Sequence, residues 1–254
     1  MNPDMSSNAL IEMRHIARHF GHITALDDLD FSVQSGEVVA LLGDNGAGKS
    51  TLIKILTGIY PPSSGQILFE GRTVRFDTPQ AARNAGIETV YQDLALIPLM
   101  SIARNFFLGR ELTRHWGPFR LLDEAAMNQR VTQALGAIGI DIRAADEAVA
   151  ALSGGERQSI AIGRAMHFGS KLLILDEPTS ALSIGETRKV LGYIRQARDR
   201  GLGVVFITHN IHHVFEVADR LTILSHGRKL GDFRRGEIGP DEVARLIMGE
   251  SFQN

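Results

Sequence analysis

The chain has 254 residues, 44% of them hydrophobic and 22% charged, with a net charge of −2 and no cysteine. These values predict one large α/β domain, or one domain with an inserted subdomain, and they exclude disulfide bonds. The near-neutral charge argues against binding nucleic acid through bulk charge. Residues 1–8 do not resemble a secretory signal, and no apolar run approaches the roughly 20 residues of a membrane-spanning helix. We therefore expect a soluble protein that reaches a membrane only through a partner.

Strand and helix patterns alternate from the N-terminal end. Two strand-like runs, Leu29 to Val33 and Glu37 to Leu42, flank Ser35-Gly36 and predict a hairpin. A glycine-rich loop follows, and then a helix over Thr51 to Thr57, which Gly58 ends. A second hairpin and a further strand are expected over Ile67–Val74 and Ile87–Tyr91.

Helical periodicity dominates the middle of the chain, in Ile102–Leu108, Glu124–Ile138 and Gly155–Met166. We interpret residues 94–167 as a helical subdomain inserted between two parts of a core, about 9–93 and 168–254. The strand–helix rhythm then returns. The expected elements are a strand at Leu172–Leu175, a helix at Glu186–Arg198, a strand at Val204–Ile207, a helix at Ile211–Val217 and a strand at Leu221–Leu224. Apolar strands alternating with helices predict a parallel sheet covered on both faces.

The glycine-rich loop Gly43 to Ser50 matches the pattern G-x-x-x-x-G-K-[ST] between an apolar strand and a helix. Its backbone amides and the helix N-terminus would hold phosphate oxygens. Lys49 would lie at the β- and γ-phosphates, and the Ser50 hydroxyl would bind Mg²⁺. A chance match to a glycine-rich turn is the alternative. The nucleotide-binding residues expected here are Gly43, Asn45, Gly46, Ala47, Gly48, Lys49, Ser50 and Thr51.

The apolar run Leu172 to Leu175 ends in two carboxylates, Asp176 and Glu177. Asp176 would hold Mg²⁺, and Glu177 would act as the general base toward the attacking water. The alternative is a helix N-terminus, which favours acidic residues. The phosphate loop upstream favours the functional interpretation.

A third motif, Leu152-Ser153-Gly154-Gly155-Glu156-Arg157-Gln158, lies between the first two and opens a helix. Together the three resemble the ATPase subunit of ATP-binding cassette (ABC) proteins over nearly the whole chain. The resemblance implies a RecA-like P-loop NTPase with a parallel sheet core, an antiparallel β subdomain and an inserted helical subdomain.

The resemblance also assigns roles to single residues. Ser153, Gly154 and Gly155 would bind the γ-phosphate of ATP held by a second subunit, so that ATP is sandwiched head to tail. Gln92 would ligand Mg²⁺, His209 would contact the γ-phosphate, and Phe20 would stack on adenine. Each has a plainer reading: a serine N-cap, a loop residue, a structural histidine and a core aromatic. Ser183 departs from the Asp that is usual in the family, which puts the strength of coupling across the dimer in doubt.

Three segments resemble the simple-sugar (fructose/ribose-type) importers of bacteria in their single-cassette form: Gly43–Gly46, Tyr91–Glu111 and Thr208–Arg220. The resemblance implies uptake of a monosaccharide or small polyol at the cytoplasmic face of the inner membrane. The expected partners are a second nucleotide-binding subunit, transmembrane permease subunits and, indirectly, a solute-binding protein. Apolar residues near Gln92 and along Leu96 to Phe107 would contact the permease.

Two other classes of protein compete with this interpretation. The first is a non-transport cassette ATPase, in DNA repair, translation or iron–sulfur assembly. A long coiled-coil insertion would favour repair, two cassettes joined by a basic linker would favour translation, and a basic stripe would indicate nucleic acid. The sequence has none of these features. A small-molecule kinase would share the phosphate loop, but the signature around Ser153 and the carboxylate of Glu177 argue against it.

Overall fold

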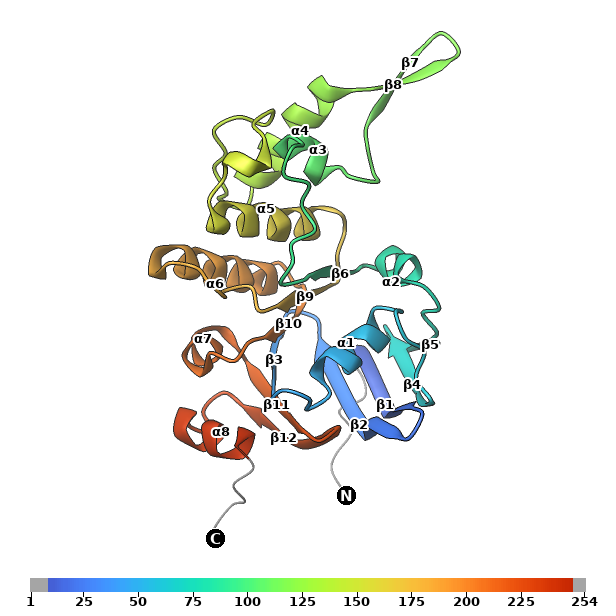
Figure 1. Cartoon of the computed structure of the whole chain (residues 1–254), viewed down its shortest axis with the longest axis vertical. Helices are drawn as coiled ribbons and strands as arrows, with labels where there is room; N and C mark the ends of the chain where they lie inside the picture. The colour runs from blue at the N-terminus through green and yellow to red at the C-terminus, as the bar shows by residue number, and fades with distance from the viewer. Residues whose placement is uncertain (1–8, 249–254) are drawn as a thin grey trace. The chain divides into compact units, whose positions relative to one another are not determined.

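The structure is a computed structural model that describes residues 9–248 (Figure 1). No helix in this range is long and apolar enough to cross a membrane. The elements, in chain order, are β1 (Ala9–Phe20), β2 (Ile23–Gln34), β3 (Val38–Leu42), α1 (Lys49–Leu56), β4 (Ser64–Phe69), β5 (Arg72–Val74), α2 (Pro79–Ala85), β6 (Ile87–Val90), α3 (Ile102–Phe106), β7 (Thr113–Trp116), β8 (Phe119–Leu122), α4 (Glu124–Gly136), the 3₁₀ turn η1 (Val149–Ala151), α5 (Gly154–His167), β9 (Leu172–Asp176), α6 (Ile184–Asp199), β10 (Gly203–Ile207), α7 (Ile211–Val217), β11 (Arg220–Ser225), β12 (Arg228–Arg234) and α8 (Pro240–Ile247).

The chain folds into two compact units. Among the described residues, the first unit contains 9–89, 170–177 and 194–248, and the second contains 90–169 and 178–193. The stretch 94–167, which the sequence predicts to be a helical subdomain, lies within the second unit, together with the beginning of α6.

A six-stranded sheet in the order β12-β11-β3-β10-β9-β6 forms the framework of the first unit. Strands β11, β3, β10 and β9 pair in parallel, and β12 pairs with β11 in antiparallel. All five residues of β3 and of β10 are buried, as expected of central strands covered on both faces. The predicted α/β class with a parallel core is confirmed.

The predicted hairpin around Ser35-Gly36 is wrong. Strand β2 pairs with β1 in a separate four-stranded antiparallel sheet, β2-β1-β4-β5, whereas β3 lies between β10 and β11. The turn at Ser35-Gly36 leads the chain from one sheet to the other, with Gly36 in the left-handed region at φ 69°. An apolar run such as β3 is stabilised by burial between parallel neighbours, and turn chemistry alone does not reveal those partners. The second predicted hairpin, β4–β5, is present.

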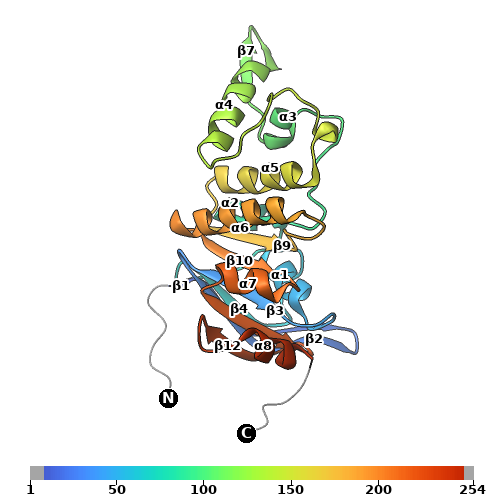
Figure 2. The same ribbon diagram turned by 90° about the vertical axis from the view of Figure 1, so that its left-hand side faces the viewer.

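The core of the first unit joins both of its sheets. Buried residues of α1, such as Leu52 and Ile55, pack in one cluster with Phe31 of β2 and Val205 of β10. Helix α1 is thereby fixed at the carboxyl end of β3, where the phosphate loop lies. Figure 2 shows α7 and α8 close together in this unit, and the two helices are in contact.

Helices α3, α4 and α5 pack around a separate core in the second unit. Phe106 and Phe107 are almost fully buried there, against Met127 of α4 and Ile160 of α5. Gly163 allows α5 to approach α4 closely, because a Cβ atom at this position would lie 2.4 Å from a methyl group of Leu135. The predicted helices are present, with ends that differ by at most two residues.

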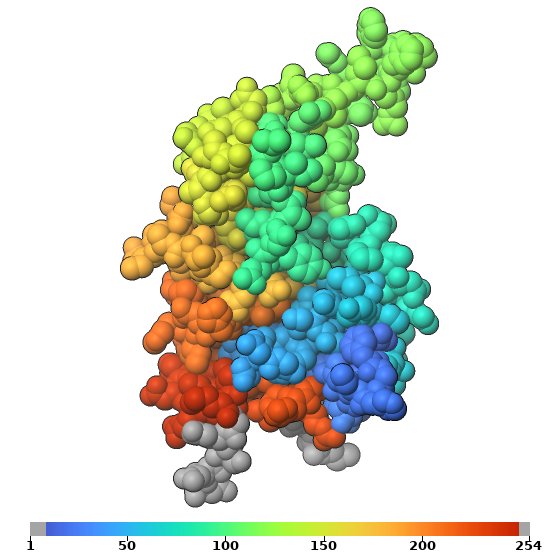
Figure 3. All heavy atoms as spheres, in the orientation of Figure 1, coloured from blue at the N-terminus to red at the C-terminus, as the bar shows by residue number. Residues whose placement is uncertain are grey.

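The second unit also contains a hairpin, β7–β8, that the sequence analysis missed. Its two strands flank Gly117-Pro118 and place Trp116 opposite Phe119. Trp116 is 71% exposed and Phe119 is 63% exposed. In the space-filling view this green segment stands clear of the rest of its unit (Figure 3). The strands were missed because each has only four residues and the sequence on either side has helical periodicity.

Candidate functional site

The loop Gly43 to Gly48 connects the buried strand β3 to α1, as the motif predicts. Gly43, Gly46 and Gly48 all have positive φ angles. At Gly48 a Cβ atom would lie 2.7 Å from Leu26 Cδ2 and 3.0 Å from Ala25 O, so the packing requires glycine. Gly48 is also the N-cap residue of α1, and no side chain caps this helix. The first turn therefore presents backbone amides to an anion, which is the arrangement that a phosphate group needs.

Lys49 lies folded over this loop. Its Nζ donates hydrogen bonds to the carbonyl oxygens of Gly43, at 2.7 Å, and Asp44, at 2.9 Å. Burial lowers the pKa of Lys49, and the charges of Glu177, Asp44 and Asp176 act in the opposite direction. The ammonium group is thus confined beside the helix N-terminus and interacts electrostatically with the carboxylates that follow β9.

The other predicted residues of the loop take different positions. Asn45, Gly46 and Ser50 are exposed, and Thr51 is half-buried in the first turn of α1. Ala47 is buried and belongs to the core, and its amide donates to Asp44 O at 3.1 Å. The side chain of Ala47 therefore packs in the core, and only the backbone of Ala47 faces the loop.

Asp176 and Glu177 lie at the carboxyl end of β9, as predicted. Burial raises the pKa of Asp176, and the neighbouring charge of Glu177 adds to this effect. Glu177 has a φ of 50°, an unusual backbone conformation for a residue other than glycine. Its amide donates to Ile207 O at 2.9 Å, which ties the turn after β9 to β10.

The structure brings His209 to Glu177. His209 Nδ1 lies 3.0 Å from Glu177 Oε1, and the Thr208 hydroxyl donates to Glu177 Oε2 at 3.3 Å. The His209 side chain is 82% exposed, whereas that of Glu177 is 19% exposed. Both carboxylate oxygens of Glu177 thus have a partner from the segment after β10, so the acid group is held in one orientation.

The chemistry of Ser50 and Asp176 fits Mg²⁺. A hydroxyl and a carboxylate are hard oxygen ligands, which this ion prefers. A divalent cation would also offset the cost of burying the charge of Asp176. Gln92, the third predicted ligand, is exposed and belongs to the second unit.

Phe20, the residue expected to stack on adenine, is the last residue of β1 and is 38% exposed. The guanidinium of Arg18 lies 4.6 Å from its ring centroid, and Tyr60 contacts the ring edge-on at 5.3 Å between centroids. A stacked adenine would therefore need the ring face opposite Arg18.

The signature residues form a second helix N-terminus, that of α5 in the second unit. Ser153 is the N-cap residue, and it forms a complete capping box with Glu156. The Glu156 amide donates to Ser153 Oγ at 3.1 Å, and the Ser153 amide donates to Glu156 Oε2 at 2.7 Å. The plainer interpretation of Ser153 as an N-cap is thus correct, and it leaves the Ser153 hydroxyl free to donate elsewhere.

That donation goes to Glu186, a residue that the sequence analysis placed in a helix without a role. Glu186 Oε1 accepts hydrogen bonds from Ser153 Oγ and from the Gly155 amide, both at 3.1 Å. Glu186 Oε2 accepts from the amide and hydroxyl of Ser183, at 3.0 and 2.8 Å. These hydrogen bonds, chiefly those from Ser183, lower the pKa of Glu186 to about 2. The signal in the sequence is the capping-box spacing from Ser183 to Glu186.

Asn105 is a second residue that the sequence analysis missed. It is fully buried, and its side-chain amide binds the amide and carbonyl of Ile97, at 2.7 and 3.0 Å. A polar residue directly before Phe106 and Phe107 was the available signal. Asn105 holds the loop that follows Gln92 against α3.

The apolar surface expected along Leu96 to Phe107 must be corrected. Phe106 and Phe107 lie in the core of the second unit, and Leu96 packs partly against it. Leu99 is 91% exposed and Ile97 is 37% exposed. Only the loop itself therefore presents apolar side chains to a partner, because the helix after it turns inward to form the core.

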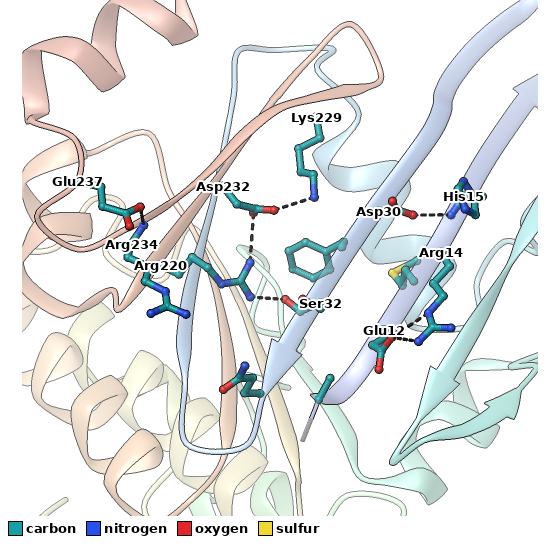
Figure 4. A pocket seen from close by; sticks show the side chains of 14 residues that line it. Glu12, Arg14, His15, Asp30, Ser32, Arg220, Lys229, Asp232, Arg234 and Glu237 are labelled. Carbon is teal, nitrogen blue, oxygen red and sulfur yellow. Dashed lines mark hydrogen bonds and ion pairs between the residues drawn. The ribbon is translucent and has the colours of Figure 1, made fainter. Parts of the chain in front are cut away.

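The first unit also contains a polar groove of about 770 Å³ between β1 and β2 on one side and β11 and β12 on the other (Figure 4). None of the predicted site residues lines it. Arg220 reaches Glu37 at 2.7 Å and Asp232 at 3.2 Å, and Lys229 reaches Asp232 at 2.7 Å. Arg220 also donates to the carbonyl oxygen of Ser32 in β2 at 2.7 Å, so this side chain joins the two sheets.

The family model of the ABC transporter matches residues 26–180. The fructose import ATP-binding protein FrcA of Rhizobium meliloti is 48% identical, and the match covers 89% of this chain and 88% of that protein. The xylose/arabinose import ATP-binding protein XylG of Sulfolobus acidocaldarius is 44% identical, with coverage of 94% and 93%.

Solved structures have the same fold. An ATP-binding cassette of an ABC transporter in its ADP conformation superposes with a TM-score of 0.78 at 24% identity, covering 94% of this chain and 95% of that one. A dimeric cassette in a post-hydrolysis state, bound to ADP and Pi, gives a TM-score of 0.72 at 23% identity, covering 90% and 100%.

Proposed function

This chain belongs to the ABC transporter family, and on that premise we propose that it is the ATP-hydrolysing subunit of a sugar importer. The import proteins FrcA and XylG, which it resembles over most of its length, support a monosaccharide or similar small polyol as the solute. The competing assignment to DNA repair, translation or iron–sulfur assembly has no support among these relatives.

The proposal depends on the Glu177–His209 pair at the end of β9. The charge of Glu177 acts on Lys49 in the phosphate loop, and the helix that follows this loop has no side-chain cap. The loop amides and Lys49 bind the phosphate groups of ATP and balance their charge. Glu177 accepts a proton from the attacking water, with its carboxylate oriented by Thr208 and His209. His209, which is largely exposed, also contacts the γ-phosphate.

Mg²⁺, when bound, would neutralise negative charge on the phosphate groups. Ser50 and Asp176 would hold it. We assign adenine stacking to Phe20, on the ring face that Arg18 leaves open.

We further propose that two copies of the chain bind ATP between them. The phosphate loop of one copy and Ser153, Gly154 and Gly155 of the other contact the same nucleotide. The dimeric cassette with ADP and Pi supports such an assembly through its fold. Transmembrane permease subunits then hold the dimer at the cytoplasmic face of the membrane, and a solute-binding protein delivers the sugar to them. The exposed side chains of Ile97 and Leu99 form the contact with the permease.

ATPase assays and sugar uptake test these assignments together. The purified chain should hydrolyse Mg-ATP, with a rate that rises faster than linearly with protein concentration. Leu99→Asp should keep this basal rate but abolish uptake in cells, because it introduces a charge only at the exposed loop. Leu230→Asp is a matched control, because Leu230 is also exposed but lies on β12 of the first unit. A strictly linear rate from a monomer would contradict the dimer, and uptake unaffected by Leu99→Asp would contradict the permease contact.

A further inference from the structure

The carboxylate of Glu186 occupies hydrogen-bond donors that the proposed function assigns to ATP. One of its oxygens accepts from Ser153 Oγ and the Gly155 amide. The side chain lies directly against Gly155, where an added Cβ atom would be 2.5 Å from Glu186 Cγ, Cδ and Oε1. The signature thus already holds an anion, and that anion comes from the same chain.

We propose that Glu186 is a placeholder for the γ-phosphate, bound to the signature of the undocked subunit and displaced when ATP arrives on the partner subunit. This inference rests on the proposed two-copy function. It assigns to Glu186 a positioning role: the residue acts on the reaction through the signature and touches no reacting atom.

The donors cannot serve both anions at once. A serine hydroxyl and a backbone amide each have a single hydrogen to donate. The hydrogen bonds from Ser153 and Gly155 must therefore move from the carboxylate to the phosphate. Two negative groups at one site also repel each other, which favours complete exchange over sharing.

The other carboxylate oxygen of Glu186 keeps its hydrogen bonds when the carboxylate leaves the signature. It accepts from the amide and hydroxyl of Ser183, and the Glu186 amide donates to Ser183 Oγ at 3.3 Å. This capping box at the start of α6 is independent of the signature. Glu186 can therefore release Ser153 and Gly155 while it still caps α6.

The same geometry gives Ser183 a role. Serine and aspartate are both strong N-cap residues, so Ser183 keeps the cap that the usual family residue would supply. In addition, its hydroxyl donates to the carboxylate that contacts the signature, which an ionised aspartate could not do. The signature and Ser183 are therefore linked through the side chain of Glu186.

Dimerisation driven by a non-hydrolysable ATP analogue tests the proposal. Glu186→Gln removes the competing charge and keeps the shape of the side chain. The protein concentration at half-dimerisation, measured by analytical ultracentrifugation, should fall by roughly tenfold or more, the effect of one charged hydrogen-bond acceptor. Glu124→Gln is the matched control, because Glu124 is also a first-turn glutamate in the second unit, on α4. It should leave the midpoint unchanged.

The outcomes separate the two levels of inference. If the wild type dimerises and Glu186→Gln dimerises equally well or less well, the placeholder is wrong and the proposed function stands. If the wild type does not dimerise with the analogue, the proposed function fails and the placeholder fails with it.

A second measurement uses the isolated chain and does not depend on dimerisation. With ¹⁵N-glycine labelling, the Gly155 amide resonance of the wild type should be insensitive to inorganic phosphate, because Glu186 already accepts its hydrogen bond. In Glu186→Gln the same resonance should shift on titration with phosphate. An equal shift in the wild type would show that the site is open and would overturn the proposal, and so would the absence of any shift in the variant. Thermal melting confirms that the variant is folded.

Discussion

The phosphate loop and the signature are both helix N-termini built with glycine, yet they are prepared differently for an anion. The N-cap of α1 is Gly48, and no side chain caps its first turn. The N-cap of α5 is Ser153, which forms a capping box with Glu156 and also binds Glu186. The first site presents the amides of the first turn of α1 without a side-chain cap. In the loop before that turn, the Asn45 amide donates to Asp44 Oδ1 and the Lys49 ammonium donates to two loop carbonyls. The second holds a carboxylate of its own chain.

This difference corresponds to the roles that we propose for the two sites. A loop that binds ATP within one subunit gains affinity when its geometry is fixed and the first turn of its helix has no side-chain cap. A signature that binds only the nucleotide of another subunit would have hydrogen-bond donors without a protein acceptor until that nucleotide arrives. An internal anion satisfies them and makes docking an exchange rather than a simple addition. The following predictions test this contrast, starting with the largest expected effect.

Glu177→Gln should reduce ATP turnover by about 10² to 10⁴-fold, the usual cost of removing a general base. ATP binding should remain, because the phosphate loop is unchanged. The dimer should then become stable, since ATP is not consumed. Turnover and the mass on size-exclusion chromatography with Mg-ATP measure both effects. Turnover equal to that of the wild type would remove Glu177 from this role.

Lys49→Ala should weaken ATP binding to the isolated chain by roughly tenfold or more, because one charged hydrogen-bond donor to the phosphates is lost. Ser153→Arg should leave this affinity unchanged, since the signature serves only the partner's nucleotide. Titration with a fluorescent ATP analogue compares the two variants. Equal losses of affinity would show that both sites contact the nucleotide of one chain, and the contrast between them would fail.

Mixing Lys49→Ala with Ser153→Arg should restore part of the ATPase activity. Each pure variant dimer has two defective sites, whereas a mixed dimer has one site with both defects and one with neither. Activity measured after mixing, against each variant alone, decides the question. The absence of recovery would indicate that both sites must be intact, a tighter coupling than we expect with Ser183 in place of the usual aspartate.

The smallest effects concern stability, and they should have opposite signs at the two sites. Burial raises the pKa of Asp176 above its usual 3.8, so its contribution to stability is lost as the pH rises through the folded-state value. Asp176→Asn should therefore melt at a higher temperature than the wild type at pH 7 without Mg²⁺. The difference should shrink at pH 3.

The pKa of Glu186 is lowered from 4.5 to about 2, so its contribution is present above pH 4.5 and is lost as the pH falls toward 2. Glu186→Gln should therefore melt at a lower temperature than the wild type at pH 7, and this deficit should shrink at pH 3. Melting curves of both variants at the two pH values provide the measurement. If both variants shifted the melting temperature in the same direction at pH 7, the proposed contrast between the two sites would be wrong.

The sequence by itself determined the features that depend on neighbouring residues. The turn from β3 into α1, the carboxylates after β9 and the start of α5 at Ser153 each follow from a short run of residues. Local spacing fixes local geometry, because glycine at a positive φ and an N-cap serine act within a few residues of where they stand. The α/β class followed from the same local patterns.

Only the tertiary structure decided which distant segments meet. Strand β3 has buried parallel neighbours instead of a hairpin partner, because burial on both faces outweighs the turn at Gly36. His209 reaches Glu177 because β9 and β10 are adjacent and end at the same edge of the sheet. Glu186 reaches Ser153 from 33 residues away. The packing of whole elements fixes such contacts, and their residues carry no local mark of it.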